Sequence, residues 1–189
     1  MALFYRGAGI GTYWHVNEPR IRGFIPHSPG TLASLDRLMN HIRSGATESP
    51  YVSLTRSPGV ALGYARLGKG KPTSTKPAYV WEIELTNPLP ANVQLLDPVQ
   101  AIAAELPGPA ESLSYHHDGA PTFLLGLIDP SQQHFLTGNR PLLPGEGSSP
   151  RPPNLTVELE TLVRALRDAE VLALGTIPAA CVRARHEVY

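Results

Sequence analysis

A strand pattern and a helix start meet in the stretch Tyr51-Val52-Ser53-Leu54-Thr55-Arg56-Ser57-Pro58. Residues 51–55 are rich in aromatic, β-branched and apolar side chains, which predicts a strand. Side chains alternate between the two faces of a strand, so Ser53 and Thr55 share one face. Pro58 is typical of the first turn of a helix, predicted here through Arg66. We therefore expect a strand whose polar end leads into a helix N-terminus, a place that can accept an anion.

The segments on either side of this stretch predict further short strands and helices. The alternation of apolar and other residues predicts strands at 2–5, 78–85, 122–128, 170–174 and 181–188. Helical spacing predicts one helix over 31–43, capped by Thr31 or Ser34, and another from Asn154 to Leu166. Because strands outnumber helices and alternate with them irregularly, we predict an α+β domain with a mostly antiparallel sheet.

The composition excludes several classes of protein. The chain has 189 residues, 42% of them hydrophobic, so we expect residues 1–189 to form one domain with a real core. The formal net charge is zero, which argues against a dedicated duplex-binding protein. With 17 glycines and 20 prolines the chain cannot be a helical bundle. Many of these lie in residues 107–153, which we expect to be a loop region rich in proline and glycine.

No membrane partner is expected, because the longest apolar stretch, residues 123–128, is far shorter than the ~20 residues of a membrane span. No Sec signal peptide is visible either. We expect a protein that is cytoplasmic, or secreted without such a signal, and monomeric. Cys181 is the single cysteine, which rules out an internal disulfide.

Three segments combine strand context with polar chemistry. Arg6 follows an apolar strand, with Gly7 behind it where a ligand could approach the backbone. The second segment carries Ser53, and in the third Asp168-Ala169-Glu170 places two acids at the entry to a strand. Each has an ordinary interpretation by itself: a surface cation, a helix cap and a solvated acid pair. Their order along the chain carries more information than any one of them.

That order resembles the Arg–Ser–Glu class of mono-ADP-ribosyltransferases, which includes cholera toxin and the pierisin-like enzymes. In this family an aromatic-Arg pair on a first strand precedes a Ser-Thr-Ser strand with a following Pro, and a late strand carries a Gln/Glu-x-Glu pair. The matching stretches here are Leu3-Phe4-Tyr5-Arg6-Gly7, Tyr51 to Pro58 with Val60-Ala61, Tyr79-Val80-Trp81-Glu82-Ile83, and Asp168-Ala169-Glu170 with Gly175-Thr176-Ile177-Pro178.

The resemblance implies a fold with a split, mostly antiparallel sheet and flanking short helices, and it implies an enzyme that uses NAD as substrate without a metal. Glu170 matches the glutamate that stabilises the oxocarbenium-like transition state, and Ser53 the serine that holds it. Arg6 matches the arginine that pairs with the dinucleotide phosphates, and Asp168 the residue that orients the nucleophile. The residues expected to contact NAD are Arg6, Gly7, Ser53, Thr55, Arg56 and Glu170.

Two departures from the family pattern leave the acceptor open. Leu54 and Thr55 stand where the family usually has Thr and Ser, although Thr55 keeps a hydroxyl. Asp168 is shorter than the usual Glu or Gln. The acceptor is therefore open among protein, nucleic acid and small molecules, and water as acceptor would make the chain an NAD glycohydrolase. A binding module for NAD or ADP-ribose without turnover is the alternative outside the enzymes.

Other polar clusters have simpler explanations. Glu82 and Glu84 share one face of a predicted strand and are expected to face solvent. The pair His116-His117 precedes Asp118-Gly119, where a turn is a better explanation than a metal site. Ser53 lacks the Gly-x-Ser-x-Gly pattern of a serine hydrolase.

Overall fold

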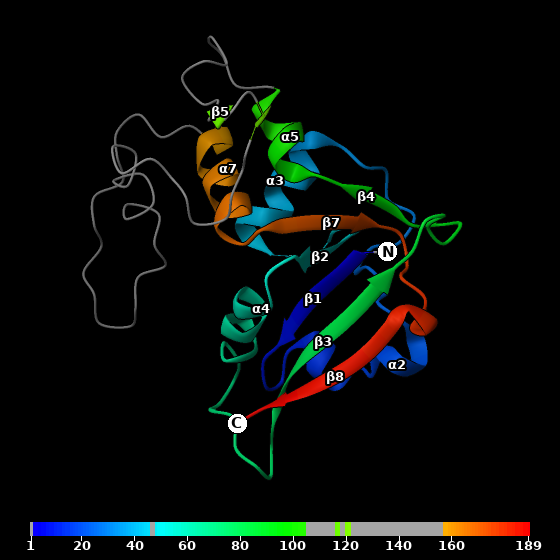
Figure 1. Cartoon of the computed structure of the whole chain (residues 1–189), viewed down its shortest axis with the longest axis vertical. Coiled ribbons are helices and arrows are strands. Elements are labelled where there is room, and N and C mark those ends of the chain that lie inside the picture. The colour runs from blue at the N-terminus through cyan, green and yellow to red at the C-terminus, as the bar shows by residue number, and fades with distance from the viewer. Residues whose placement is uncertain (1, 46–47, 105–115, 118–119, 122–156) are drawn as a thin grey trace, which may run out of the picture.

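A computed structural model describes residues 2–45, 48–104, 116–117, 120–121 and 157–189 of the chain (Figure 1). Most of the predicted 107–153 loop region, including the strand expected at 122–128, lies outside the described residues, as does the expected helix start at Asn154. Among the described residues, no helix combines the length and the apolar character needed to cross a bilayer.

Six strands form one antiparallel sheet. They are β1 (Ala2–Ala8), β2 (Tyr51–Thr55), β3 (Ala78–Leu85), β4 (Gln94–Leu96), β7 (Glu170–Leu174) and β8 (Val182–Val188). Their order across the sheet is β4-β7-β2-β1-β3-β8, and each neighbouring pair is antiparallel. A separate two-stranded pair joins β5 (His116–His117) to β6 (Ala120–Pro121). The predicted α+β class with a mostly antiparallel sheet is confirmed.

The large sheet is divided between β2 and β1. Strands β2 and β7 pair along all of β2, and β1 and β3 pair along all of β1. Between β1 and β2, by contrast, the register holds a single pair, Tyr5 with Thr55. We call this contact the seam. It separates a first half, β4-β7-β2, from a second half, β1-β3-β8.

Short helices cover the two halves separately. They are α1 (Tyr13–Val16), α2 (Pro19–Arg22), α3 (Leu35–Ser44), α4 (Pro58–Ala65), α5 (Pro98–Ala103), α7 (Val157–Arg167) and the 3₁₀ turn η3 (Ala179–Cys181). Helices α3, α5 and α7 lie together over the first half, and α4 packs on β1 and β3 of the second (Figure 1). Ser34 caps α3 by accepting from the Arg37 amide, so this helix starts later than the predicted residue 31.

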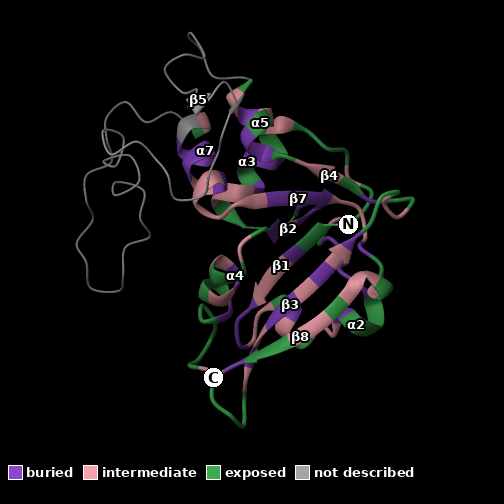
Figure 2. Ribbon diagram, in the orientation of Figure 1, coloured by how far each residue is buried: buried purple, intermediate pink, exposed green. Residues whose placement is uncertain are grey.

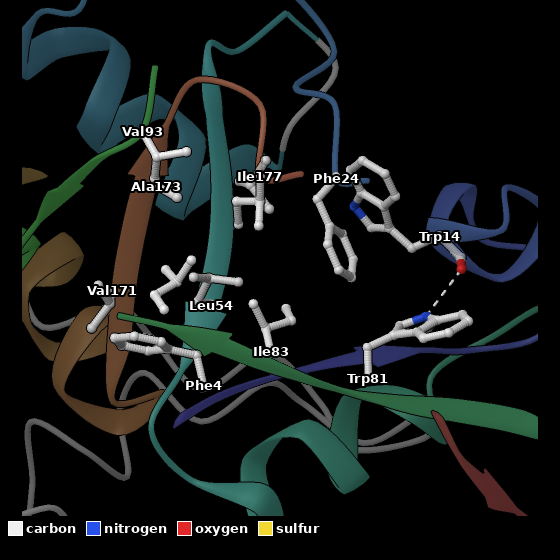
Figure 3. Packing of buried hydrophobic residues seen from close by; sticks show 13 residues of the cluster. Phe4, Trp14, Phe24, Leu54, Trp81, Ile83, Val93, Val171, Ala173 and Ile177 are labelled. Atoms are coloured by element: carbon white, nitrogen blue, oxygen red, sulfur yellow. Dashed lines mark hydrogen bonds between the residues drawn. The ribbon is translucent and has the colours of Figure 1, made fainter. Parts of the chain in front are cut away.

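Among the described residues, buried hydrophobic side chains form three clusters. The buried segments are coloured along the ribbon in Figure 2. The central cluster draws on both halves: Phe4 and Ile83 from the second half meet Leu54 and Val171 from the first (Figure 3). At one end of it the Trp81 indole N–H donates to the Trp14 carbonyl oxygen at 3.2 Å. The other clusters lie under α3, α5 and α7, and under α4. The halves are thus joined mainly by apolar packing, since the seam supplies few backbone bonds.

Candidate active site

A pocket of about 210 Å³ lies beside the seam. Its lining includes Arg6 and Gly7 of β1, Ser53 and Thr55 of β2, and Glu170 at the start of β7. The predicted site residues that line it are Arg6, Gly7, Ser53, Thr55, Asp168 and Glu170, whereas the exposed Arg56 is not in the lining. Strands that are far apart in the sequence therefore bring most of the expected site residues together.

The turn from α7 into β7 places two acids in this pocket. Helix α7 ends at Arg167, and Ala169 takes a left-handed conformation with φ of 48°. Asp168 and Glu170, the residues on either side of Ala169, both line the pocket. The Thr55 hydroxyl donates to the Asp168 carbonyl at 2.6 Å, which ties the end of β2 to this turn. Thr55 is buried, and this hydrogen bond joins the two segments.

Glu170 lies where β2 and β7 pair. Its Cα is opposite Thr55, and Ser53 is opposite Leu172, so Ser53 and Glu170 are diagonal neighbours on one face. Burial raises the pKa of Glu170 to about 7, a hydrogen bond from Ser53 lowers it, the nearby Asp168 carboxylate raises it, and the Arg6 guanidinium lowers it. The carboxylate therefore gains and loses its proton near neutral pH.

Arg6 reaches the pocket from the other side of the seam. It shares a face of β1 with Phe4 and Ala8, both in the central cluster, and its guanidinium lies 5.7 Å from the Trp14 ring. Its Nη1 donates to the Ser53 carbonyl oxygen. Burial lowers the pKa of Arg6 to about 10, against the attraction of Glu170, so the side chain stays positively charged at neutral pH. Its Nε is buried without a hydrogen-bond partner among the described residues.

His41 on α3 also lines the pocket, and the sequence prediction missed it. This buried side chain joins two serines: Nε2 lies 2.6 Å from the Ser53 hydroxyl and Nδ1 lies 2.6 Å from the Ser49 hydroxyl. Burial, with the Arg6 charge, lowers the pKa of His41 to about 3, so the ring is neutral.

The donors and acceptors in this chain of hydrogen bonds can be ordered. Ser53 donates to Glu170, so it accepts from the N–H of His41 Nε2. Nδ1 of the neutral histidine is then an acceptor, and the Ser49 hydroxyl donates a hydrogen bond to it. Ser49 accepts in turn from the Tyr51 backbone N–H at 3.1 Å. Every member is satisfied, and together they hold Ser53 toward Glu170.

Gly7 lines the pocket, where we predicted that a ligand approaches the backbone, and it also contacts helix α4. Helix α4 occupies the space into which a side chain at this position would project. A Cβ on Gly7 would lie 2.1 Å from the Ala61 carbonyl oxygen and 2.7 Å from the Ala65 amide nitrogen. The absence of a side chain therefore lets α4 pack directly on β1.

The other polar clusters lie outside the pocket lining. Glu82 and Glu84 share a face of β3, as predicted, and both pair with Arg183 of β8. His116 and His117 form β5, and the two residues after them lie outside the described part. Within the described residues, no group of three or more metal-binding side chains could hold a metal ion.

Comparisons with known proteins add little. No family model and no curated protein matches the chain. One solved structure, a nicked CARDS toxin, aligns with 97% of this chain at 16% identity and a TM-score of 0.45. The chain spans 25% of that toxin's length. At this identity and TM-score the alignment carries no argument about function, so the case rests on the pocket.

Proposed function

We propose that the chain is a mono-ADP-ribosyltransferase: it cleaves NAD between nicotinamide and ribose and passes ADP-ribose to an acceptor. The observation that carries the proposal is the meeting of Arg6, Ser53 and Glu170 in one pocket. A cation, a hydroxyl and a carboxylate held together at the join of two half-sheets suit a reaction in which positive charge develops on a sugar.

Glu170 is the group that acts on the transition state. As the bond to nicotinamide stretches, the ribose becomes oxocarbenium-like, and an adjacent carboxylate stabilises this charge more than it stabilises the ground state. Only the ionised form does so. Because the pKa of Glu170 is raised to about 7, a large part of the enzyme holds the active form at neutral pH. Ser53, backed by His41, keeps the carboxylate in place.

Arg6 is suited to bind the dinucleotide. It lines the pocket and remains cationic, so its positive charge attracts the anionic phosphates of NAD. A pocket of about 210 Å³ is smaller than the ~300–1,000 Å³ typical for a whole drug-sized ligand. We infer that it takes the nicotinamide and its ribose, with the rest of NAD outside it.

An NAD glycohydrolase is the second candidate, and one observation favours it. Asp168, which matches the nucleophile-orienting position, already forms an ion pair with Arg167 at 2.7 Å. Water needs less orientation by such a carboxylate than a macromolecular acceptor does.

Labelled NAD, incubated with the protein alone and with a cell extract, tests these alternatives. Label that moves to macromolecules supports transfer, and subsequent protease and nuclease digestion assigns the acceptor class. Free ADP-ribose without labelled macromolecules supports hydrolysis. NAD binding without any nicotinamide release supports a binding module and contradicts both enzymes.

A further inference from the structure

The second acid of the pocket, Asp168, accepts hydrogen bonds from two side chains of its own chain on both of its oxygens. Arg167 Nε donates to Asp168 Oδ1 at 2.7 Å, and Arg167 Nη2 donates to Oδ2 at 2.7 Å. The Tyr64 hydroxyl, from α4, donates to the same Oδ2 at 2.5 Å. The result is a forked ion pair with a third donor added to it.

This geometry closes Asp168 to a cationic acceptor. A guanidinium binds a carboxylate best through two parallel N–H bonds, and Arg167 already makes both of them. A new guanidinium would also approach the positive charge of Arg167. Among the described lining residues, Glu170 is the remaining carboxylate, and the reaction itself needs it at the ribose.

The same geometry prevents Asp168 from serving as a base. A guanidinium has a pKa above ~12, so it must lose a proton before its nitrogen can attack. Both oxygens of Asp168 already accept hydrogen bonds from Arg167 or Tyr64, so a guanidinium proton would have to compete with these donors. Water and alcohol hydroxyls are neutral and can attack an oxocarbenium-like carbon first, losing the proton afterwards.

Resting on the proposed function, we propose that Arg167 determines acceptor specificity: by holding Asp168 it excludes guanidine acceptors and directs the enzyme to neutral oxygen nucleophiles. The bond between C1′ of the ribose and nicotinamide breaks, and nicotinamide leaves with the electron pair. The oxygen of a hydroxyl or of water bonds to C1′, and its proton passes to solvent at the pocket mouth. Tyr64, 42% exposed, borders that mouth.

The test is to remove the Arg167 side chain from Asp168 and to supply a small guanidine compound as acceptor. Arg167→Gln removes the fork while keeping a good helix former at the end of α7. Wild type and variant are incubated with NAD and agmatine, and ADP-ribosyl-agmatine and ADP-ribose are separated by chromatography. We expect the ratio of agmatine adduct to ADP-ribose to rise at least about tenfold in the variant.

Three further variants make the result specific. Arg66→Gln removes an exposed arginine at the end of α4 and should leave the ratio unchanged. Tyr64→Phe removes one donor from Asp168 and should raise the ratio less than Arg167→Gln does. Arg167→Gln combined with Asp168→Asn should abolish the gain. An unchanged ratio in Arg167→Gln, or a wild type that already prefers agmatine, would overturn the inference.

Binding of agmatine, measured by calorimetry without NAD, separates this inference from the proposed function. We expect Arg167→Gln to bind agmatine at least about fivefold more tightly than wild type and Arg66→Gln. Equal affinities overturn the inference whether or not NAD is cleaved. Absence of nicotinamide release from wild type overturns the proposed function. Tighter agmatine binding by the variant would still show that Arg167 keeps guanidines away from Asp168.

Discussion

The two halves of the sheet differ in what they contribute to the pocket. The second half, β1-β3-β8, has the longer strands and provides one charged group to the pocket, Arg6. The first half, β4-β7-β2, has shorter strands and provides Ser53 and Glu170, with His41 on the helix that covers it. The single backbone pair at the seam leaves room for side chains from both halves. Backbone pairing holds each half together, while the pocket lies where pairing is lost.

The largest effect is expected when the first half loses its carboxylate. Glu170→Gln keeps the size of the side chain but removes its charge, so the rate of nicotinamide release should fall by about 10²–10³-fold. The matched control is Glu84→Gln, which removes a carboxylate of the second half that pairs with Arg183. It should leave the rate unchanged. Comparable activity in Glu170→Gln and wild type would remove the carboxylate from the mechanism.

The next effect concerns the packing of the second half against α4. Gly7→Ala would place a methyl group 2.1 Å from the Ala61 carbonyl oxygen, so strand and helix must separate. We expect a loss of about 3 kcal/mol in the free energy of unfolding, measured by urea denaturation. Gly63→Ala, also in α4 but with nothing within 4 Å of the new Cβ, should stabilise the helix by up to about 1 kcal/mol. Similar effects of the two substitutions would contradict this account of the packing.

The buried Glu170 carboxylate of the first half should reduce the free energy of unfolding when it is ionised. Glu170 has a pKa of about 7 in the folded protein against a reference value of 4.5, so the folded state binds more protons between these values. Stability therefore falls as the pH rises through this window, by at most about 3 kcal/mol. Glu170→Gln should be more stable than wild type at about pH 8 and show little difference near pH 4.5, as thermal unfolding can measure. A gain of the same size at both values would point to another cause.

A smaller effect is expected from the hydrogen bond between Ser53 and Glu170. The proposed mechanism needs the ionised carboxylate, so kcat/KM should increase about tenfold per pH unit below pH 7 and level off above it. The Ser53 hydroxyl lowers the pKa of Glu170, so Ser53→Ala should move the midpoint to higher pH, by roughly one unit. Ser57→Ala, at the cap of α4, is the control and should leave the midpoint in place. A midpoint shift toward lower pH in Ser53→Ala would contradict the assignment.

The smallest effect is expected at the turn that starts β7. Ala169 has a positive φ of 48°, which costs a residue with a Cβ roughly 1 kcal/mol relative to glycine. Ala169→Gly should therefore stabilise the protein by up to about 1 kcal/mol. Ala173→Gly, in the buried middle of β7, should destabilise it instead. Chemical denaturation of the pair measures both signs, and a loss of stability in Ala169→Gly would rule out the strain.

The strands were largely predictable because their signals are local. The predicted strands at 51–55, 78–85 and 170–174 agree with β2, β3 and β7, which are rich in buried apolar side chains and have Pro or Gly near their ends. Helices α1 and α2, with four residues each, were missed. Helices this short are marginal by themselves, and α1 depends on Trp14 packing against Phe24 at 4.9 Å.

Helix α5 could have been found from the sequence. Asp97 precedes Pro98, and its side chain accepts from the Val99 and Gln100 amides, which is a recognisable N-cap. His41 is the opposite case. It lies within the predicted helix 31–43, but its partners Ser49 and Ser53 are set by how that helix packs on β2, and helical spacing does not contain this information.

The ordered chain of hydrogen bonds from Tyr51 to Glu170 makes His41 a reporter of the charge on Glu170. Its ring stays neutral at working pH, since its pKa is lowered to about 3, so its own titration does not alter its resonances there. Ionisation of Glu170 strengthens the bond from Ser53 and polarises each hydroxyl and ring N–H behind it. The chemical shifts of the His41 ring nitrogens should therefore change when Glu170 gains or loses its proton. They report the charge in the pocket from a buried position under the first half of the sheet.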